Sequence, residues 1–154
     1  METKKVKLYD IPKWDRNFIS ICYAVKSWSK DNFKVGAVTV RDRRILTTGY
    51  NGFPFGFDDS ESRIKNKSIK RKFMIHAEEN CVINASRNGI SLIDSTIYVS
   101  SFPCINCAKV IVQSGIKRVV CFSFDEDDPK VKRYKINDSV KLFEECGVEL
   151  TVIQ

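Results

Sequence analysis

The stretch TIYVSSFPCINCAKVIVQSGIKRVVCFSF, residues 96–124, decides the expected fold of this chain. It opens with the β-branched and aromatic run 96–100, continues with a helical pattern over 104–113, and closes with a second apolar run at 118–124. Two strands joined through a helix form a parallel crossover, because parallel strands cannot be linked by a tight turn. The stretch therefore predicts an α/β protein.

The flanking sequence extends this unit on both sides. We expect further helices at 15–30, 76–87 and 138–146, and further strands at 35–40, 45–50 and 148–153. Asp15 is the expected N-cap of the first helix, and residues 51–72, rich in Gly, Phe and charge, are expected to form a long irregular loop. The whole pattern predicts a three-layer α/β/α domain over residues 1–154, with a mixed five-stranded sheet.

Composition narrows the class of protein. The chain has 154 residues, of which 43% are apolar, and no apolar run approaches the length of about 20 residues that spans a bilayer. METKKVKLYD has no apolar segment after it, so we expect a cytoplasmic protein with no membrane partner. The net charge of +7 fits either a solvated basic surface or an anionic partner such as a nucleotide or nucleic acid. The basic run KNKSIKRK at 65–72 fits a solvated loop.

The six cysteines divide into two groups. Four lie among apolar neighbours and are expected to be buried free thiols: Cys22, Cys81, Cys121 and Cys146. Cys104 and Cys107 differ, because they follow Pro103 with two residues between them at the expected start of a helix. Without an export signal, a disulfide framework is not expected.

His76, the single histidine, also lies at the expected start of a helix. A helix N-terminus offers free N–H groups and a positive dipole end, which favour the thiolate that a metal requires. His76, Cys104 and Cys107 would give a tetrahedral zinc three protein ligands and leave one position open, as in catalytic sites. The residues therefore indicate a catalytic zinc site with one Zn²⁺ per chain.

Glu78 lies two residues after His76, close enough to face a water on the metal without binding the metal itself. Zinc lowers the pKa of such a water towards about 7, and a nearby carboxylate can take its proton. Glu79 is expected to point elsewhere. Two alternatives stay open on the residues alone: a redox C-x-x-C pair, and a structural zinc completed by Cys81 or Cys121.

The motifs together resemble the cytidine and deoxycytidylate deaminase superfamily, most closely its deoxycytidylate (dCMP) deaminases. The stretches that carry the resemblance are KVGAV at 34–38, GYNGFP at 49–54, HAEEN at 76–80, FPCINCAKVIVQSGIKRVV at 102–120 and SVKLFEECGV at 139–148. They cover most of the chain. The resemblance implies a hydrolase that converts dCMP to dUMP with zinc, supplies the dTTP precursor, and forms a homo-oligomer, either a dimer or a hexamer.

The resemblance also implies roles for individual residues around the substrate. The activated water attacks C4 of cytosine while Glu78 moves the protons. Asn51 hydrogen-bonds the nucleoside, although an Asn-Gly turn explains it nearly as well. The backbone around Ala77 and Ser101 lines the base pocket, and an aromatic ring stacks on the base, either Phe124 or Tyr134. The 5′-phosphate is expected near Ser29, Lys30 and Lys34.

Regulation is a further expectation from the resemblance. Gly49, Tyr50 and Gly52 of the GYNG loop would belong to an effector site where dCTP activates and dTTP inhibits, and Mg²⁺ would accompany the nucleotide effector. The short segment between GYNG and HAE has no additional Cys or His pair, so a second zinc is not expected. The alternative functions are deamination of dCTP or of both nucleotides, a nucleic-acid cytidine or adenosine deaminase, and a non-catalytic binding module.

Overall fold

A mixed six-stranded sheet forms the centre of the molecule, in a computed structural model that describes residues 3–154. The strands are β1 (Lys4–Val6), β2 (Gly36–Arg41), β3 (Arg44–Tyr50), β4 (Thr96–Val99), β5 (Arg118–Phe122) and β6 (Glu149–Ile153). They lie in the order β1-β6-β5-β4-β2-β3. The pairs among β1, β6, β5 and β4 are parallel, and β2 pairs antiparallel with both β4 and β3.

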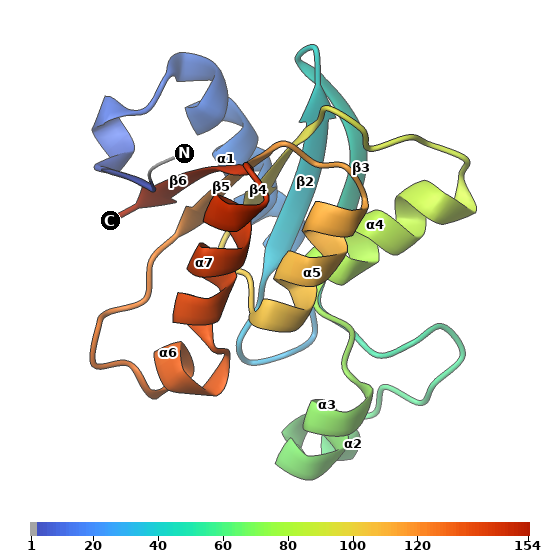
Figure 1. The fold of residues 1–154 in the computed structure, drawn as a ribbon. Coiled ribbons are helices and arrows are strands. Elements are labelled where there is room, and N and C mark those ends of the chain that lie inside the picture. The colour runs from blue at the N-terminus through green and yellow to red at the C-terminus, as the bar shows by residue number, and fades with distance from the viewer. Residues whose placement is uncertain (1–2) are drawn as a thin grey trace.

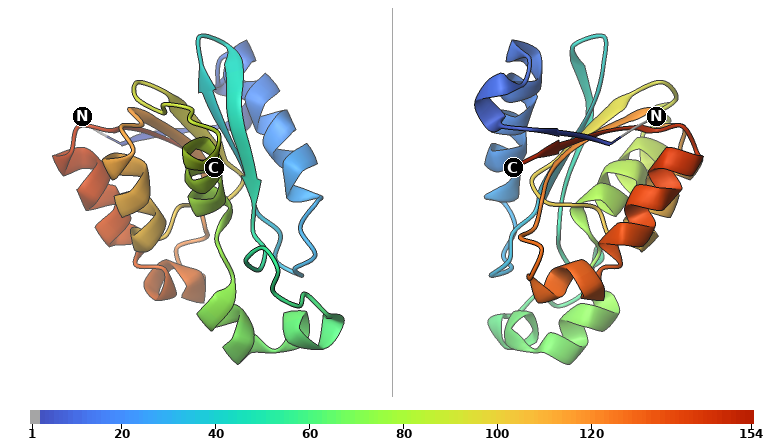
Figure 2. Two further views of the ribbon diagram at one scale, coloured as in Figure 1. Left: turned by 90° about the vertical axis from the view of Figure 1, so that its right-hand side faces the viewer. Right: turned by 60° about the vertical axis from the view of Figure 1, so that its left-hand side comes forward.

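Helices cover both faces of this sheet (Figure 1; Figure 2). Helix α1 (Lys13–Lys26) packs on one face, and α4 (Ala77–Arg87), α5 (Ile105–Gln113) and α7 (Ile136–Glu145) pack on the other. The short helices are η1 (Leu8–Asp10), α2 (Glu61–Lys65), α3 (Lys67–Phe73) and α6 (Pro129–Arg133). The predicted three-layer α/β/α architecture is confirmed. None of the helices within residues 3–154 has both the length and the apolar character needed to cross a membrane.

The molecule has two hydrophobic cores, one on each face of the sheet, because successive side chains of a strand point to opposite faces. In β4, Tyr98 faces the α1 side, whereas Ile97 and Val99 face the side of α4, α5 and α7. All three are buried, as expected for a strand covered on both faces. The sheet is thereby fixed between its helices, and the loops at the carboxyl ends of its strands are positioned for a site.

Some of the sequence predictions were wrong. The sheet has six strands because β1, with two exposed lysines, gains its structure only by pairing with β6. The segment 51–72 is not wholly irregular, since it contains α2 and most of α3. Cys146 is exposed, because it follows the last turn of α7 rather than lying on its buried face; Cys22, Cys81 and Cys121 are buried as predicted.

Asp15 is not the N-cap of the first helix, which begins at Lys13 after Pro12. Its buried carboxylate instead accepts hydrogen bonds from Tyr98 Oη at 2.7 Å and from both Arg118 Nη atoms, at 2.9 and 2.7 Å. Burial pushes the pKa of Asp15 upward, but these donors outweigh it and leave that pKa below its ordinary value. The buried Asp15 carboxylate therefore joins α1 to β4 through Tyr98 and to β5 through an ion pair with the partly buried Arg118.

Replacing Asp15 with Ala is expected to lower the free energy of unfolding by about 3 kcal/mol, because it removes the buried carboxylate that pairs with both Arg118 Nη atoms and leaves the partly buried guanidinium with only the exposed Glu149. Because folding lowers the pKa of Asp15, this contribution is present above about pH 4 and is lost as the pH falls through the folded-state pKa. Urea unfolding at pH 7 and pH 3 would measure both effects.

Glu149→Ala is the matched control, because Glu149 contacts the same Arg118 at 3.2 Å from an exposed position. It is expected to cost less than about 1 kcal/mol. Equal losses for the two variants would contradict the role given to Asp15.

Candidate active site

Two helix starts meet beside the sheet and bring three ligand-type side chains together. His76 is the N-cap of α4 and Cys104 is the N-cap of α5, with Cys107 in the first turn of α5. His76 Nδ1 lies 3.4 Å from Cys104 Sγ and 3.5 Å from Cys107 Sγ. Gly49 helps to fix α4, because a Cβ there would overlap the backbone of Ala77 and Cys81.

This cluster has the geometry that zinc requires. The three ligand atoms lie within 4.8 Å of one another, and a tetrahedral zinc with bonds of about 2.0–2.3 Å would hold such atoms about 3.5–3.8 Å apart. Within residues 3–154, no other group of His, Cys, Asp or Glu side chains meets this test. Cys81 and Cys121 lie outside the cluster, which disfavours a structural zinc with four protein ligands.

The electrostatics of the cluster favour a cation. Hydrogen bonds from the Cys107 thiol and with His76 lower the pKa of Cys104 to about 4. The hydrogen bond to Cys104 raises the pKa of His76 to about 9. A metal ion takes the place of the proton in such an arrangement, because its ligands must be a thiolate and a neutral imidazole. The donor set and the low pKa of Cys104 therefore fit Zn²⁺.

Glu78 lies in the first turn of α4, next to the cluster, and is only 4% exposed. Burial raises the pKa of its carboxyl to about 7. A carboxyl with a pKa near the working pH can accept a proton in one step and donate it in another. Glu79 is partly exposed and does not line the cavity beside the cluster, as the sequence predicted.

A cavity of about 530 Å³ opens over the cluster. Its floor includes His76, Ala77, Glu78, Ser101 and Cys104, and its walls come from the loop at 31–35, from α3 and from α6. Tyr134 lies over His76 with the ring centroids 6.1 Å apart, and its carbonyl accepts the Ile105 N–H at 3.1 Å. The corner after α6 is thus tied to the start of α5.

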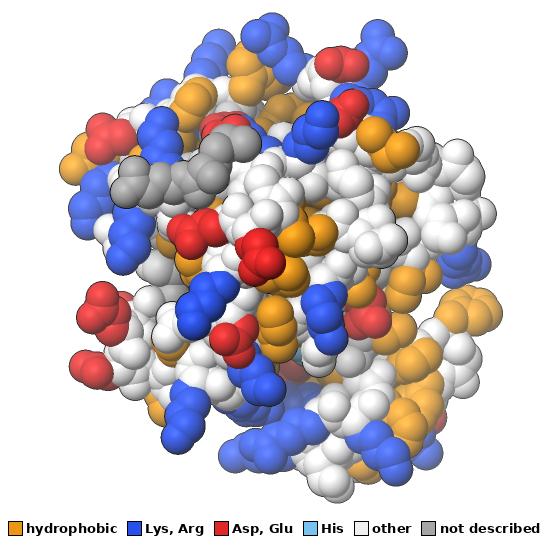
Figure 3. All heavy atoms as spheres, in the orientation of Figure 1, with side chains coloured by type: hydrophobic (Ala, Val, Ile, Leu, Met, Phe, Trp, Pro, Cys, Tyr) orange, Lys and Arg blue, Asp and Glu red, His pale blue; other side chains and the backbone are white. Residues whose placement is uncertain are grey.

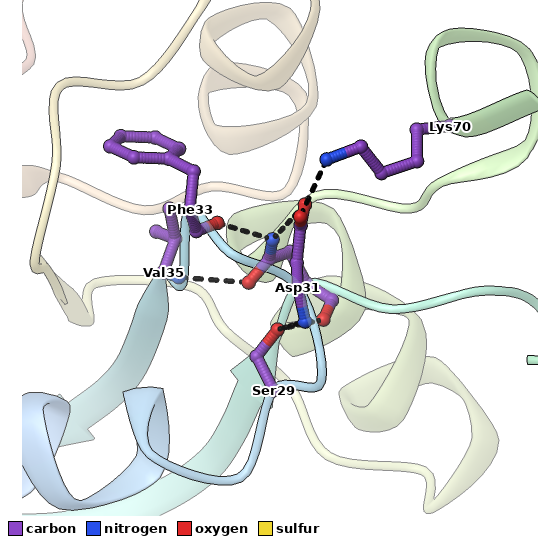
Figure 4. A network of polar contacts seen from close by, with 6 residues as sticks. Ser29, Asp31, Phe33, Val35 and Lys70 are labelled. Atoms are coloured by element: carbon purple, nitrogen blue, oxygen red, sulfur yellow. Dashed lines mark hydrogen bonds and ion pairs between the residues drawn. The ribbon is translucent and has the colours of Figure 1, made fainter. Parts of the chain in front are cut away.

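Asn51 also lines the cavity and is held by a network of polar contacts (Figure 4). Its Nδ2 donates to the Phe33 carbonyl at 2.9 Å and to Asp31 Oδ2 at 3.3 Å, and its Oδ1 accepts the Val35 N–H at 2.8 Å. Lys70 Nζ of α3 closes the network on Asp31 at 2.6 Å. Both amide hydrogens are used within the protein, so Oδ1 keeps the remaining hydrogen-bonding capacity.

Several residues predicted for the substrate do not line the cavity. Ser29 is buried behind Asn51 and donates to its carbonyl at 2.8 Å, while Lys30 is exposed and pairs with Asp59 at 2.6 Å. Lys34 is exposed outside the lining, and Phe124 packs behind Phe33 and Tyr134, which do line it.

The three residues predicted for an effector site have structural contacts of their own. Gly49 packs directly against the backbone of α4, and Gly52 forms a β-bridge with Ile75. Tyr50 is exposed beside Trp28, with the rings edge to face. An effector role for these residues stays a prediction.

Sequence reasoning missed the basic residues of the cavity walls: Lys67, Lys70 and Arg71 on α3, and Lys130, Arg133 and Lys135 on and after α6. The segment 65–72 was interpreted as a solvated loop. The sequence does contain a signal for a helix here, because positions 67, 70, 71 and 74 have the i, i+3, i+4, i+7 spacing of one helix face. The N-cap that starts this helix, Asn66, accepts the Ile69 N–H at 3.0 Å.

Comparison with known proteins gives a consistent result. The model of the family "Cytidine and deoxycytidylate deaminase zinc-binding region" matches residues 12–123. An uncharacterized deaminase in the luxG 3′ region of Aliivibrio fischeri is 40% identical over 142 residues, covering 92% of this chain and 94% of that protein. The deoxycytidylate deaminase of Enterobacteria phage T2 is 32% identical, covering 81% of this chain and 88% of that enzyme.

A solved structure agrees in fold. The dCMP deaminase of the cyanophage S-TIM5, in complex with dCMP and dUMP, superposes with a TM-score of 0.74 at 26% identity, covering 93% of this chain and 98% of that one. The predicted resemblance is therefore confirmed by sequence and by structure. This chain belongs to the cytidine and deoxycytidylate deaminase family.

Proposed function

We propose that this protein catalyses the hydrolytic deamination of dCMP to dUMP, with zinc held by His76, Cys104 and Cys107. The observation that carries the proposal is the buried Glu78 carboxyl beside the His/Cys/Cys cluster, on the floor of a cavity with basic walls. The named deoxycytidylate deaminases among the relatives support dCMP as the substrate.

The chemistry divides between the metal and the chain. When bound, zinc supplies a Lewis acid that lowers the pKa of water towards about 7. Glu78 accepts the proton of the attacking water, delivers a proton to N3 of the cytosine ring, and helps to protonate the departing amine. A C4–O bond forms and the C4–N4 bond breaks, so that dUMP and ammonia leave with no oxidation or reduction.

The remaining lining residues hold the nucleoside. The backbone at Ala77 and Ser101, on the floor of the cavity, would lie against the edge of the base. Asn51 Oδ1, whose second lone pair is not used within the protein, would accept a hydrogen bond from a sugar hydroxyl. Tyr134 lies over the cluster and offers a ring for stacking, with Phe124 behind it.

The proposal is tested by incubating the zinc-loaded protein with dCMP, dCTP, CMP, deoxycytidine and a short single-stranded DNA, and measuring ammonia release. We expect turnover of dCMP well above that of deoxycytidine. Turnover of the DNA in preference to dCMP would favour the nucleic-acid deaminase. Binding of nucleotide with no turnover of any substrate would favour a non-catalytic module.

Two further properties belong to the same proposal. Adding dCTP or dTTP to the dCMP assay tests regulation through the GYNG loop. Within residues 3–154, no group of side chains supports a separate Mg²⁺ site. Exposed aromatic side chains, Trp28, Tyr50 and Phe55 among them, support a homo-oligomer. Size-exclusion chromatography with light scattering would measure its size.

A further inference from the structure

Helix α3 turns one basic face towards the cavity. Lys67, Lys70, Arg71 and Met74 all line it, at the spacing of a single helix face. Lys72 lies on the same helix but outside the lining, and its Nζ lies 5.4 Å from the centroid of the Phe73 ring, a cation–π contact. Helix α3 therefore has basic side chains on two faces: Lys67, Lys70 and Arg71 line the cavity, and Lys72 lies on the outer face.

An ion pair fixes the rotation of α3. Lys70 Nζ lies 2.6 Å from Asp31 Oδ1, with the Asp31 side chain only 9% exposed. Lys67 and Arg71, one turn apart, line the cavity on the same helix face as Lys70, which is anchored on this buried carboxylate. Within residues 3–154, no carboxylate forms an ion pair with either of them.

The opposite wall is basic as well. Arg133 and Lys135 line the cavity on the α6 side, and Figure 3 shows Lys and Arg side chains gathered on the lower part of this face, where α3 and α6 lie. The two acidic residues of the lining are Asp31, already paired with Lys70, and Glu78 on the floor. The cavity therefore has cations on two walls and its one unpaired carboxyl beside the metal cluster.

We propose that Lys67 and Arg71 of α3 bind the phosphate of the nucleotide and make the site selective for phosphorylated deoxycytidine over the free nucleoside. The inference rests on the proposed function, since it assumes that the base lies on the Glu78 floor. A phosphate between two unpaired cations forms charge-assisted hydrogen bonds, and an arginine can donate two in parallel. The inference gives the phosphate role to Lys67 and Arg71 in place of Lys30, because Lys30 is paired with Asp59 outside the lining.

The observations favour a free nucleotide over a nucleic-acid strand. The unpaired cations line the two walls of one cavity of about 530 Å³, a volume within the range of small-molecule sites. A strand that passes through the site would need cations that continue along the surface to follow its backbone.

The test measures binding of two reaction products, dUMP with its phosphate and deoxyuridine without it, so the result does not depend on turnover. Isothermal titration calorimetry would give the Kd of dUMP, of deoxyuridine and of a deoxycytidine decamer for the zinc-loaded wild type, Lys67→Ala and Arg71→Ala. The control is Lys72→Ala, which removes the same charge from the outer face of α3. We expect each cavity-side variant to bind dUMP about tenfold more weakly, with deoxyuridine binding changed less than about twofold and Lys72→Ala like the wild type.

Three results would overturn the inference: wild-type protein that binds dUMP no better than deoxyuridine, an equal loss for both ligands, or a loss of affinity for a deoxycytidine decamer without a loss for dUMP. Failure of the proposed function would look different, because dUMP binding would depend on Lys67 and Arg71 while dCMP was not converted.

Discussion

Glu78→Gln is expected to lower kcat for dCMP by about 1,000-fold or more, with one zinc still bound per chain. The amide keeps the size of the carboxyl but cannot accept the proton of the attacking water or return it to the ring nitrogen. Burial beside the cluster raises the pKa of Glu78 to about 7, so a single group can serve both transfers near neutral pH. Steady-state kinetics and metal analysis on the same sample would measure the effect.

Glu79→Gln is the matched control, because it makes the same chemical change one position further along α4, outside the cavity lining. Its kcat should stay within about threefold of the wild type, as for a substitution away from the reacting atoms. A Glu78→Gln protein that retained full turnover, or two variants with equal losses, would contradict the role of Glu78 as the proton carrier.

Cys104→Ala is expected to abolish measurable dCMP turnover and to reduce the zinc content from about one to near zero per chain. The variant leaves two protein ligands, and the cluster lies at the starts of α4 and α5, so stability should fall as well. A metal present at about 1,000 times its Kd contributes about 4 kcal/mol to stability, which the variant would lose. Atomic absorption and thermal unfolding would report the two losses.

Cys146→Ala removes a thiol of the same kind from an exposed position outside the cluster, and it should keep both zinc and activity. If Cys104→Ala bound zinc as tightly as the wild type, the metal would have to be held elsewhere. If both variants lost stability equally, the loss would not report on the cluster.

Much of the fold could be predicted from the sequence, because its signals are local. The β4–α5–β5 unit was identified from β-branched runs around a helical pattern, and the two helix starts that carry His76 and Cys104 lie where the sequence placed them. Strand β1 could not be predicted, since Lys4 and Lys5 are exposed and the strand depends on pairing with a segment about 150 residues away.

The residues of the site also fall into those that a local sequence motif identifies and those that depend on contacts distant in sequence. Glu78, His76 and the two cysteines belong to short motifs with fixed spacing, so their chemistry could be proposed before their positions were known. The basic walls of the cavity could not be predicted from the sequence, because α3 and α6 are short helices whose orientation depends on contacts distant in sequence. Lys70 reaches Asp31, 39 residues earlier, and Lys67 and Arg71 line the cavity on the same face of α3.

The most direct test of the central claim is removal and return of the metal in the wild-type protein. The protein would be stripped with a chelator, assayed for dUMP and ammonia from dCMP, and assayed again after one equivalent of Zn²⁺ per chain. We predict that turnover falls with the metal content and returns with zinc, with dUMP and ammonia formed in equal amounts. Full turnover by the stripped protein, or zinc-loaded protein that forms no dUMP, would contradict the account.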